Sequence, residues 1–114
     1  MIFFRERTFN MSRIKLQSEY PDLDKYEYDN GDIVYYKKDT NIRHNPYGPA
    51  IIHEDGTKIY LIENKYHRLD GPALIFNNYD EQYWINDECF TKQQFEYHSE
   101  RLKYLGKEHL KCLI

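Results

Sequence analysis

The sequence predicts a mainly β protein made of stacked antiparallel β-hairpin repeats and closed by a helical cap at the C-terminus. Three observations predict this fold class. Aromatic residues make up 17% of the chain, with 12 Tyr among them, and such residues favour half-buried sheet positions. A Gly-Pro-Ala motif recurs after 23 positions, and a helix-capping motif follows the last repeat. At 114 residues, the chain has the size of one domain with a modest core.

The repeat extends beyond the Gly-Pro-Ala motif. HNPYGPA, at residues 44–50, matches HRLDGPA, at residues 67–73, and the apolar runs AII and ALI that continue them also match. Upstream, DNGDIVYY resembles EDGTKIYL at an offset of 25 residues, which pairs Arg43 with Arg68. About two and a half units thus occupy residues 26–90. A period in the low twenties is typical of repeat architecture.

Each unit is predicted to form one β-hairpin. The run AII leads to Asp55-Gly56, a strong hairpin dipeptide because Gly adopts the positive φ that such turns need. In the next unit the turn is NNYD, residues 77–80, which lacks the Gly but holds two Asn residues able to adopt the left-handed region. Gly-Pro-Ala suits a joint between hairpins. Gly permits a close backbone approach or a positive φ, Pro fixes φ at the first strand residue, and Ala lets the next unit pack tightly.

A structural role is therefore predicted for the loop residues of both copies. Their polar side chains are expected to hydrogen-bond the loop backbone or to pair with one another. The alternative is a general acid/base pair of His67 and Asp70, but the other copy has Asn45 and Tyr47 where Arg68 and Asp70 stand. The structural repeat residues are His44, Gly48, Pro49, Ala50, His67, Arg68, Asp70, Gly71, Pro72 and Ala73.

Two aromatic ladders are the candidate interaction surfaces. Tyr35, Tyr60 and Tyr83 align in what we call the tyrosine row, and Tyr36, Leu61 and Trp84 align one place on. Adjacent strand residues point to opposite faces, so the ladders are expected on the two sides of one sheet. In one interpretation both are internal core. In the other, one ladder forms a homodimer or binds a partner. The candidate interaction residues are Tyr35, Tyr36, Tyr60, Tyr83 and Trp84.

The two ends of the chain are predicted to flank the repeats. In the N-terminal segment, residues 1–25, RIKLQ alternates like a strand and YPDLD is typical of a turn. In the C-terminal cap, residues 91–114, Thr91 and Gln94 form a capping box. A helix is therefore expected to start at Lys92.

A second helical segment is expected after Ser99, which would cap it, with Gly106 interrupting it. Its apolar residues are expected to cover the open end of the stack; they are Leu102, Leu105, Leu110 and Ile114. The same segment carries four cations, Arg101, Lys103, Lys107 and Lys111. These are interpreted as a solvated face, with a patch for nucleic acid or an acidic partner as the alternative.

Charge and composition narrow the function classes. The formal net charge of −3 provides no overall attraction to phosphate backbones or anionic lipid. No apolar run is long enough for a transmembrane segment, and the first ten residues lack the features of a secretory signal. An intracellular location is therefore expected. Cys89 and Cys112 are then free thiols, with a disulfide between them as the alternative.

Catalytic and metal motifs are missing from the sequence. The five histidines form no HxH, HExxH or Cys/His cluster with zinc-like spacing, and no phosphate-binding or nucleophile motif occurs. No catalytic residue, cofactor or metal is predicted, and the chain is not expected to be an enzyme. A small hydrolase that uses His67 and Asp70 remains the third hypothesis.

The pattern HRLDGPALIF followed by YWIN, together with HNPYGPAIIHEDGTKIYL, resembles the MORN-repeat variants of large DNA viruses and phages. The resemblance covers about residues 26–98. It implies stacked hairpins and protein binding or scaffolding inside a host cell or in a virion, with no catalytic activity. A Gly that is common before His-Arg in this group is Asn64 here and Asp87 in the next copy. The alternative function is binding to nucleic acid or anionic lipid through the C-terminal basic segment.

Overall fold

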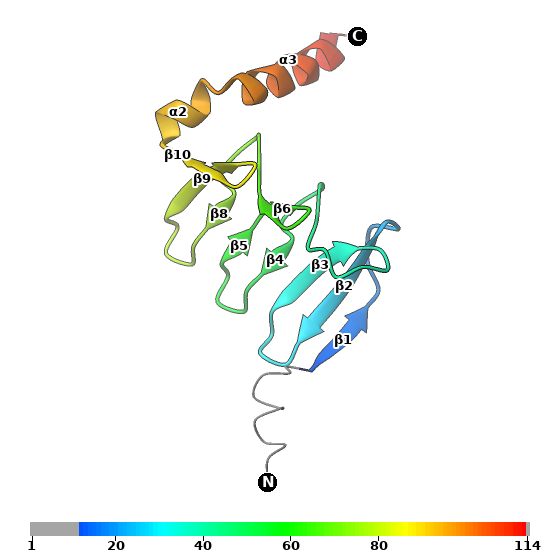
Figure 1. Ribbon diagram of the computed structural model, residues 1–114. Coiled ribbons are helices and arrows are strands. Elements are labelled where there is room, and N and C mark those ends of the chain that lie inside the picture. Colours follow the sequence, from blue (N-terminus) through cyan, green and yellow to red (C-terminus); the bar gives the residue numbers. More distant parts are fainter. Residues whose placement is uncertain (1–11, 114) are drawn as a thin grey trace.

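The computed structural model describes residues 12–113, with side chains for residues 12–106. It confirms the predicted fold class: an antiparallel eight-stranded sheet is followed by a pair of C-terminal helices (Figure 1). The eight strands of this main sheet are β1 (Arg13–Leu16), β2 (Leu23–Tyr28), β3 (Ile33–Lys37), β4 (Ile51–Ile52), β5 (Lys58–Ile59), β8 (Leu74–Ile75), β9 (Glu81–Ile85) and β10 (Glu88–Phe90). A small second sheet pairs β6 (Leu61–Ile62) with β7 (Lys65–Tyr66).

Three hairpins of the main sheet repeat the same turn. They are β2–β3, β4–β5 and β8–β9, and each turn has one residue with positive φ. Gly31 has φ +92° and Gly56 has φ +95° in the first two, but Tyr79 has φ +72° in the third. The left-handed residue of that turn is therefore a tyrosine and neither Asn. Asn78 instead accepts a hydrogen bond from the backbone N–H two residues further on, as Asn30 does in the first turn.

The second and third repeats each continue into a further tight turn after their second strand, between β6 and β7 in one and between β9 and β10 in the other. The turn residues Glu63 and Asn64 have φ of +48° and +67°, and Asn86 and Asp87 have φ of +49° and +67°. Two consecutive left-handed residues define a type I′ hairpin turn, which Asn and Asp tolerate. Asn64 and Asp87, which stand where the resemblance leads us to expect glycine, thus both adopt the positive φ of this turn.

These tight turns also connect successive units. The Asn64 N–H donates to the Arg43 carbonyl, and the Asp87 N–H donates to the Tyr66 carbonyl in the next repeat, both at 2.9 Å. Arg43 is therefore the structural equivalent of Tyr66, and the expected pairing of Arg43 with Arg68 is wrong. Asn45 is likewise the equivalent of Arg68, because their N–H groups donate to the Leu61 and Trp84 carbonyls respectively. The two extra residues of the earlier unit lie before Arg43, since Tyr36 pairs with Arg43 where Leu61 pairs with Tyr66.

The first hairpin begins upstream of the expected repeat region. β2 starts at Leu23, so the boundary expected at residues 25 and 26 falls within this strand. β1, the strand expected from RIKLQ, pairs with β2 at one edge of the sheet, and a Leu23 N–H bond to the Tyr20 carbonyl closes the turn expected at YPDLD. The described residues therefore contain three complete hairpins of the repeat type, β2–β3, β4–β5 and β8–β9.

One hydrophobic cluster is built on the face of the sheet that carries Val34. A register row runs from Val34 through Ile51 and Ile59 to Leu74 across four strands. Tyr36 and Leu61 extend this core, and Leu61 is only 2% exposed. Burying a side chain of this size contributes roughly 1.5–3 kcal/mol. Burial, and then a hydrogen bond with the Tyr28 hydroxyl, raise the pKa of Tyr36 to about 12.

The C-terminal helices confirm the predicted capping box. Helix α2 (Lys92–Glu96) starts after Thr91, whose hydroxyl accepts from the Gln94 N–H while the Gln94 side chain accepts from the Thr91 N–H. Phe95 of α2 is 2% exposed and packs on Tyr83, with ring centroids 4.8 Å apart. Helix α2 therefore covers the last repeat.

Helix α3 (Ser99–Leu113) differs from the expectation in two ways. Ser99 is its first residue and does not cap it; His98 does, since its Nδ1 accepts from the Glu100 N–H and its carbonyl from the Leu102 N–H. Gly106 does not interrupt the helix, because it lacks the left-handed conformation with which glycine ends helices. Leu102 is 48% exposed, so it contributes only in part to the cover expected over the open end of the stack. The side chains of Leu110 and Ile114 lie outside the described residues.

Candidate functional site

The two Gly-Pro-Ala loops are joints of the sheet. The Tyr35 N–H donates to the Ala50 carbonyl, and the Tyr60 N–H donates to the Ala73 carbonyl, both at 2.7 Å. The strand registers, continued by one residue, place Tyr35, Ala50, Tyr60, Ala73 and Tyr83 side by side. Both alanines are 0% exposed. A small residue between neighbouring tyrosines leaves space for their rings, which explains the Ala of the motif.

Asn45 and Arg68 perform the same task in the two loops. Asn45 Nδ2 donates to the Pro49 carbonyl at 3.0 Å, and Arg68 Nη1 donates to the Pro72 carbonyl at 3.1 Å. Arg68 Nε also donates to Asp70 at 2.9 Å, and its guanidinium lies 4.0 Å from the Tyr60 ring centroid. The Arg68–Asp70 pair therefore stabilises the conformation of the second loop.

The histidines that precede the two Gly-Pro-Ala motifs, His44 and His67, act as hydrogen-bond acceptors. His44 Nδ1 accepts from the Glu63 N–H at 3.0 Å, and His67 Nδ1 accepts from the Asn86 N–H at 3.1 Å. Burial lowers the pKa of both histidines, which favours the neutral form that can accept these bonds. His67 binds a turn of the next unit while Asp70 binds Arg68, so the described contacts do not join His67 and Asp70 as an acid/base pair.

Only one of the two loop glycines is crowded. A Cβ on Gly71 would lie 2.9 Å from Arg68 Cζ, whereas a Cβ on Gly48 would meet only Asn45 Nδ2, at 4.0 Å. Neither residue has a positive φ. Gly is therefore favoured at Gly71, where a Cβ would displace the Arg68 guanidinium, and at Gly48 the structure shows neither a close approach nor a positive φ.

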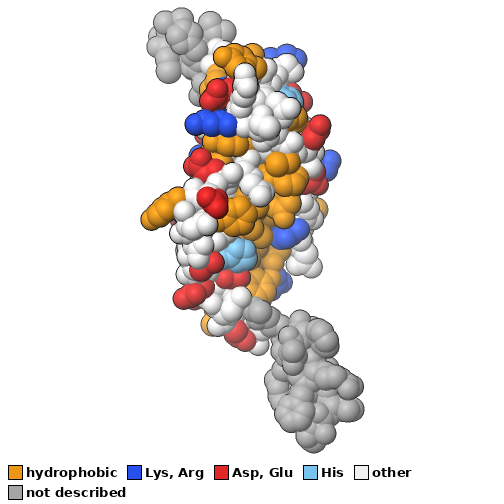
Figure 2. Space-filling model, turned by 90° about the vertical axis from the view of Figure 1, so that its left-hand side faces the viewer, with side chains coloured by type: hydrophobic (Ala, Val, Ile, Leu, Met, Phe, Trp, Pro, Cys, Tyr) orange, Lys and Arg blue, Asp and Glu red, His pale blue; other side chains and the backbone are white. Residues whose placement is uncertain are grey.

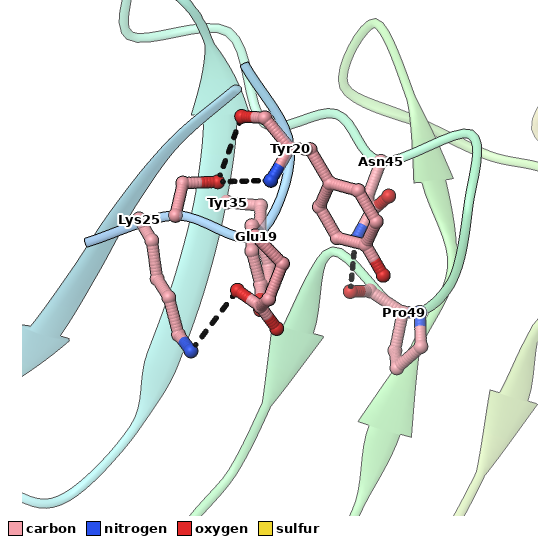
Figure 3. A network of polar contacts seen from close by, with 7 residues as sticks. Glu19, Tyr20, Lys25, Tyr35, Asn45 and Pro49 are labelled. Carbon is pink, nitrogen blue, oxygen red and sulfur yellow. Dashed lines mark hydrogen bonds and ion pairs between the residues drawn. The ribbon is translucent and has the colours of Figure 1, made fainter. Parts of the chain in front are cut away.

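The tyrosine row is covered differently at each of its three positions. Tyr35 lies against the Tyr20 ring, 5.9 Å away, and its hydroxyl donates to Glu19 at 2.9 Å (Figure 3). Tyr83 lies against Phe95, while Tyr60 has the Arg68 guanidinium over it. Tyr35 is 4% exposed, and the other two are half-buried. The terminal segments thus cover the two ends of the row.

The second ladder is part of the interior. Tyr36 and Leu61 belong to the core cluster, and Trp84 packs on Tyr66 with ring centroids 4.9 Å apart. Trp84 is half-buried. Neither ladder forms a continuous exposed aromatic face in the part of the chain that the structure describes.

A groove of about 380 Å³ opens over the middle of the tyrosine row, between the two Gly-Pro-Ala loops. Tyr60 lies among its lining residues with Tyr47 and Asn45 of the first loop, Asp70 of the second, and Tyr104 of α3. We call this the inter-loop groove. The sequence places Tyr60 in a ladder but offers no signal for Tyr104, whose approach depends on how α3 leaves the stack.

Charged side chains of both signs occur together on the face shown in Figure 2. Figure 2 shows acidic and basic side chains interspersed with hydrophobic ones on one side of the stack. Arg101 donates to the Glu96 carbonyl at 2.9 Å and lies 5.0 Å from the Phe95 ring, so this member of the predicted basic patch is engaged within the fold. Lys103 is exposed, and the side chains of Lys107 and Lys111 lie outside the described residues.

The described residues lack both a metal-binding cluster and a membrane-spanning helix. These residues contain no group of three or more His, Cys, Asp or Glu side chains placed to hold a metal ion. None of the helices in this part of the chain has the length and apolar character needed to cross a bilayer. Cys89 is an exposed free thiol, and the side chain of its proposed disulfide partner, Cys112, lies outside the described residues.

No protein-family model, no curated protein and no solved structure matches this chain. The resemblance to MORN-repeat variants therefore stays a prediction from the HRxDGPA pattern.

Proposed function

We propose that the chain is a non-catalytic repeat module that binds another protein. One observation carries this proposal. The polar loop residues hold the scaffold through bonds that recur from unit to unit, whereas the inter-loop groove stays open over Tyr60. His67 and Asp70, the two acid/base candidates, are thus engaged with the scaffold, and an aromatic surface is available beside them.

The groove has the composition of a protein-binding surface. Tyr and Arg are enriched in the cores of protein interfaces, and a few such residues provide most of the binding energy. Tyr47, Tyr60, Tyr104 and Arg68 line the groove beside the acceptor Asp70. The proposed relation to MORN-repeat variants and the intracellular setting are consistent with such a role.

Binding to nucleic acid or anionic lipid through the C-terminal basic segment is the second candidate. Lys103 is exposed and supports it, but the engagement of Arg101 with Glu96 and Phe95 reduces the charge that is free to meet a phosphate. Because phosphate contacts release counterions, such binding weakens steeply with salt.

The test is a pull-down from cell lysate with the tagged full chain, nuclease treatment and a salt titration. We expect a defined protein partner that survives nuclease and high salt and that also binds His67→Gln, a variant without the imidazole. Recovery of nucleic acid or lipid alone, lost as salt rises, would refute the proposal. So would hydrolysis of a substrate panel that His67→Gln abolishes while the fold is retained.

A further inference from the structure

The inter-loop groove is the middle one of three positions along the tyrosine row, and the chain itself fills the outer two with an aromatic ring. Tyr20 covers Tyr35, and Phe95 covers Tyr83. Tyr60, between them, faces the groove. The two filled positions therefore show which kind of side chain suits the third.

A comparison of the loops explains why the middle position is open. β2 and β3 pair Lys25 with Tyr35, and the continued register of β4 and β5 pairs Ala50 with Tyr60, 25 residues on. By the same offset Tyr20 corresponds to Asn45, which precedes a proline as Tyr20 does. The shorter Asn45 side chain turns back to the Pro49 carbonyl. The loop of the second unit thus places no aromatic ring against Tyr60, unlike Tyr20 in the first unit.

The chain's own filler also shows the polar contacts of the position. The Tyr20 ring stacks on Tyr47 with centroids 4.6 Å apart and an interplanar angle of 22°. The residue before it, Glu19, accepts hydrogen bonds from the Tyr35 hydroxyl at 2.9 and 3.0 Å. Figure 3 shows the Tyr20 ring directed toward the loop of Asn45 and Pro49 while Glu19 faces Tyr35. An acidic residue followed by an aromatic one thus provides an acceptor for the Tyr35 hydroxyl and a ring that lies against the Tyr35 ring.

The same hydroxyl contact is open in the second unit. The residue at the position of Glu19 is His44, whose Nδ1 already accepts from the Glu63 N–H. This loop therefore offers no carboxylate to the Tyr60 hydroxyl. The cation over Tyr60 does not exclude a second ring, because Tyr35 has both Tyr20 beside it and the Lys25 ammonium 5.6 Å from its centroid.

We propose that the inter-loop groove binds a Glu-Tyr dipeptide in an extended segment of a partner protein, with the tyrosine ring over Tyr60 and the carboxylate on the Tyr60 hydroxyl. The bound segment takes the place that Tyr20 and Glu19 take over Tyr35. This inference rests on the proposed protein-binding function and names the chemistry that the partner must present.

The test uses the full chain and a synthetic peptide, acetyl-QSEYPDL-amide, which copies residues 17–23. Binding is followed by isothermal titration and by NMR shift changes of the Tyr60 and Asp70 amides. Replacing the peptide Tyr by Ala should weaken binding at least about tenfold, as loss of a buried aromatic anchor does. Replacing the peptide Glu by Gln should weaken it about threefold or more, since a charge-assisted bond becomes a neutral one.

Three protein variants locate the peptide. Asn45→Tyr supplies the missing ring from the chain itself and should weaken peptide binding at least about tenfold. Tyr104→Ala removes the α3 side chain that lines the groove and should weaken peptide binding several-fold. Tyr97→Ala is the matched control, because Tyr97 is 72% exposed and does not line the groove; it should bind as the wild type does. Circular dichroism confirms that each variant is folded.

A gain of binding provides the converse test. The double substitution Glu19→Ala and Tyr20→Ala removes both groups from the first position and should raise the number of bound peptides from one to two. The proposal is overturned if the peptide does not bind the folded wild type at millimolar concentration, or if Asn45→Tyr and Tyr104→Ala, both folded, bind it undiminished. If the lysate partner of the previous section is captured equally by Asn45→Tyr, the groove assignment fails while the protein-binding function stands.

Discussion

Replacing Tyr79 by Gly should stabilise the protein. Tyr79 occupies the position of Gly31 and Gly56 in the third main-sheet turn, with φ +72°, and its side chain is 85% exposed. A non-glycine residue in the left-handed region costs about 1–2 kcal/mol. Glycine returns roughly 0.5–1 kcal/mol of this through the greater entropy of the unfolded chain. The net expectation is a gain of about 0.5–1 kcal/mol, because little packing is lost with an exposed ring.

Thermal unfolding followed by circular dichroism measures this gain. For a domain of this size, the expected rise in Tm is about 2–6 °C. Tyr79→Ala is the control, since it removes the ring but keeps the backbone penalty. In the reverse direction, Gly56→Ala should destabilise by about 1 kcal/mol, because a Cβ there meets nothing within 4 Å and only the backbone is affected. If Tyr79→Gly unfolds at the same temperature as Tyr79→Ala, the strain assigned to this turn is absent.

Four further substitutions test the scaffold. Gly71→Ala should lower the free energy of unfolding by about 1 kcal/mol, because the new Cβ displaces Arg68. Gly48→Ala should change the free energy of unfolding by less than about 0.5 kcal/mol. Equal urea midpoints for the two variants would contradict the close contact between residue 71 and Arg68. Thr91→Ala should cost about 1 kcal/mol through loss of the capping box, measured by urea unfolding. Burial lowers the pKa of His67, so its contribution to stability is complete above its ordinary pKa near 6.5 and falls as pH decreases below it. His67→Gln should therefore lose less stability than the wild type between about pH 7.5 and 5.5.

The parts of the fold that the sequence predicts are those in which local chemistry and repeat spacing agree. The capping box of Thr91 needs only residues three positions apart. The Asp55-Gly56 turn likewise depends on its own dipeptide, and the matched offset of the loops carries it to the neighbouring unit. Agreement between local signals and the repeat made the β-hairpin architecture predictable.

The missed features depend on tertiary surroundings. A tyrosine at a left-handed position contradicts its local preference, and it is held there because both flanking strands are paired in the sheet. The continuation of α3 through Gly106 reflects the small cost of glycine within a helix, about 1 kcal/mol, which does not by itself end a helix. The sequence therefore predicted an Asn at the left-handed position of the third turn and an interruption at Gly106, and both predictions were wrong.

The candidate site was only partly predictable, for a reason that concerns repeat proteins in general. The alignment of the repeats places Tyr60 in the tyrosine row. The groove above Tyr60, however, arises from a difference between two loops, because Asn45 stands where the preceding loop has Tyr20. These two residues can be matched only once the first hairpin is known to begin before the recognisable motif. Identical repeats would fill every inter-loop position in the same way, leaving either all or none of them open. A stack acquires a single site where one repeat carries a short side chain and its neighbours carry rings. Departures from the repeat, rather than the repeated residues themselves, are therefore where binding specificity in this chain should be sought.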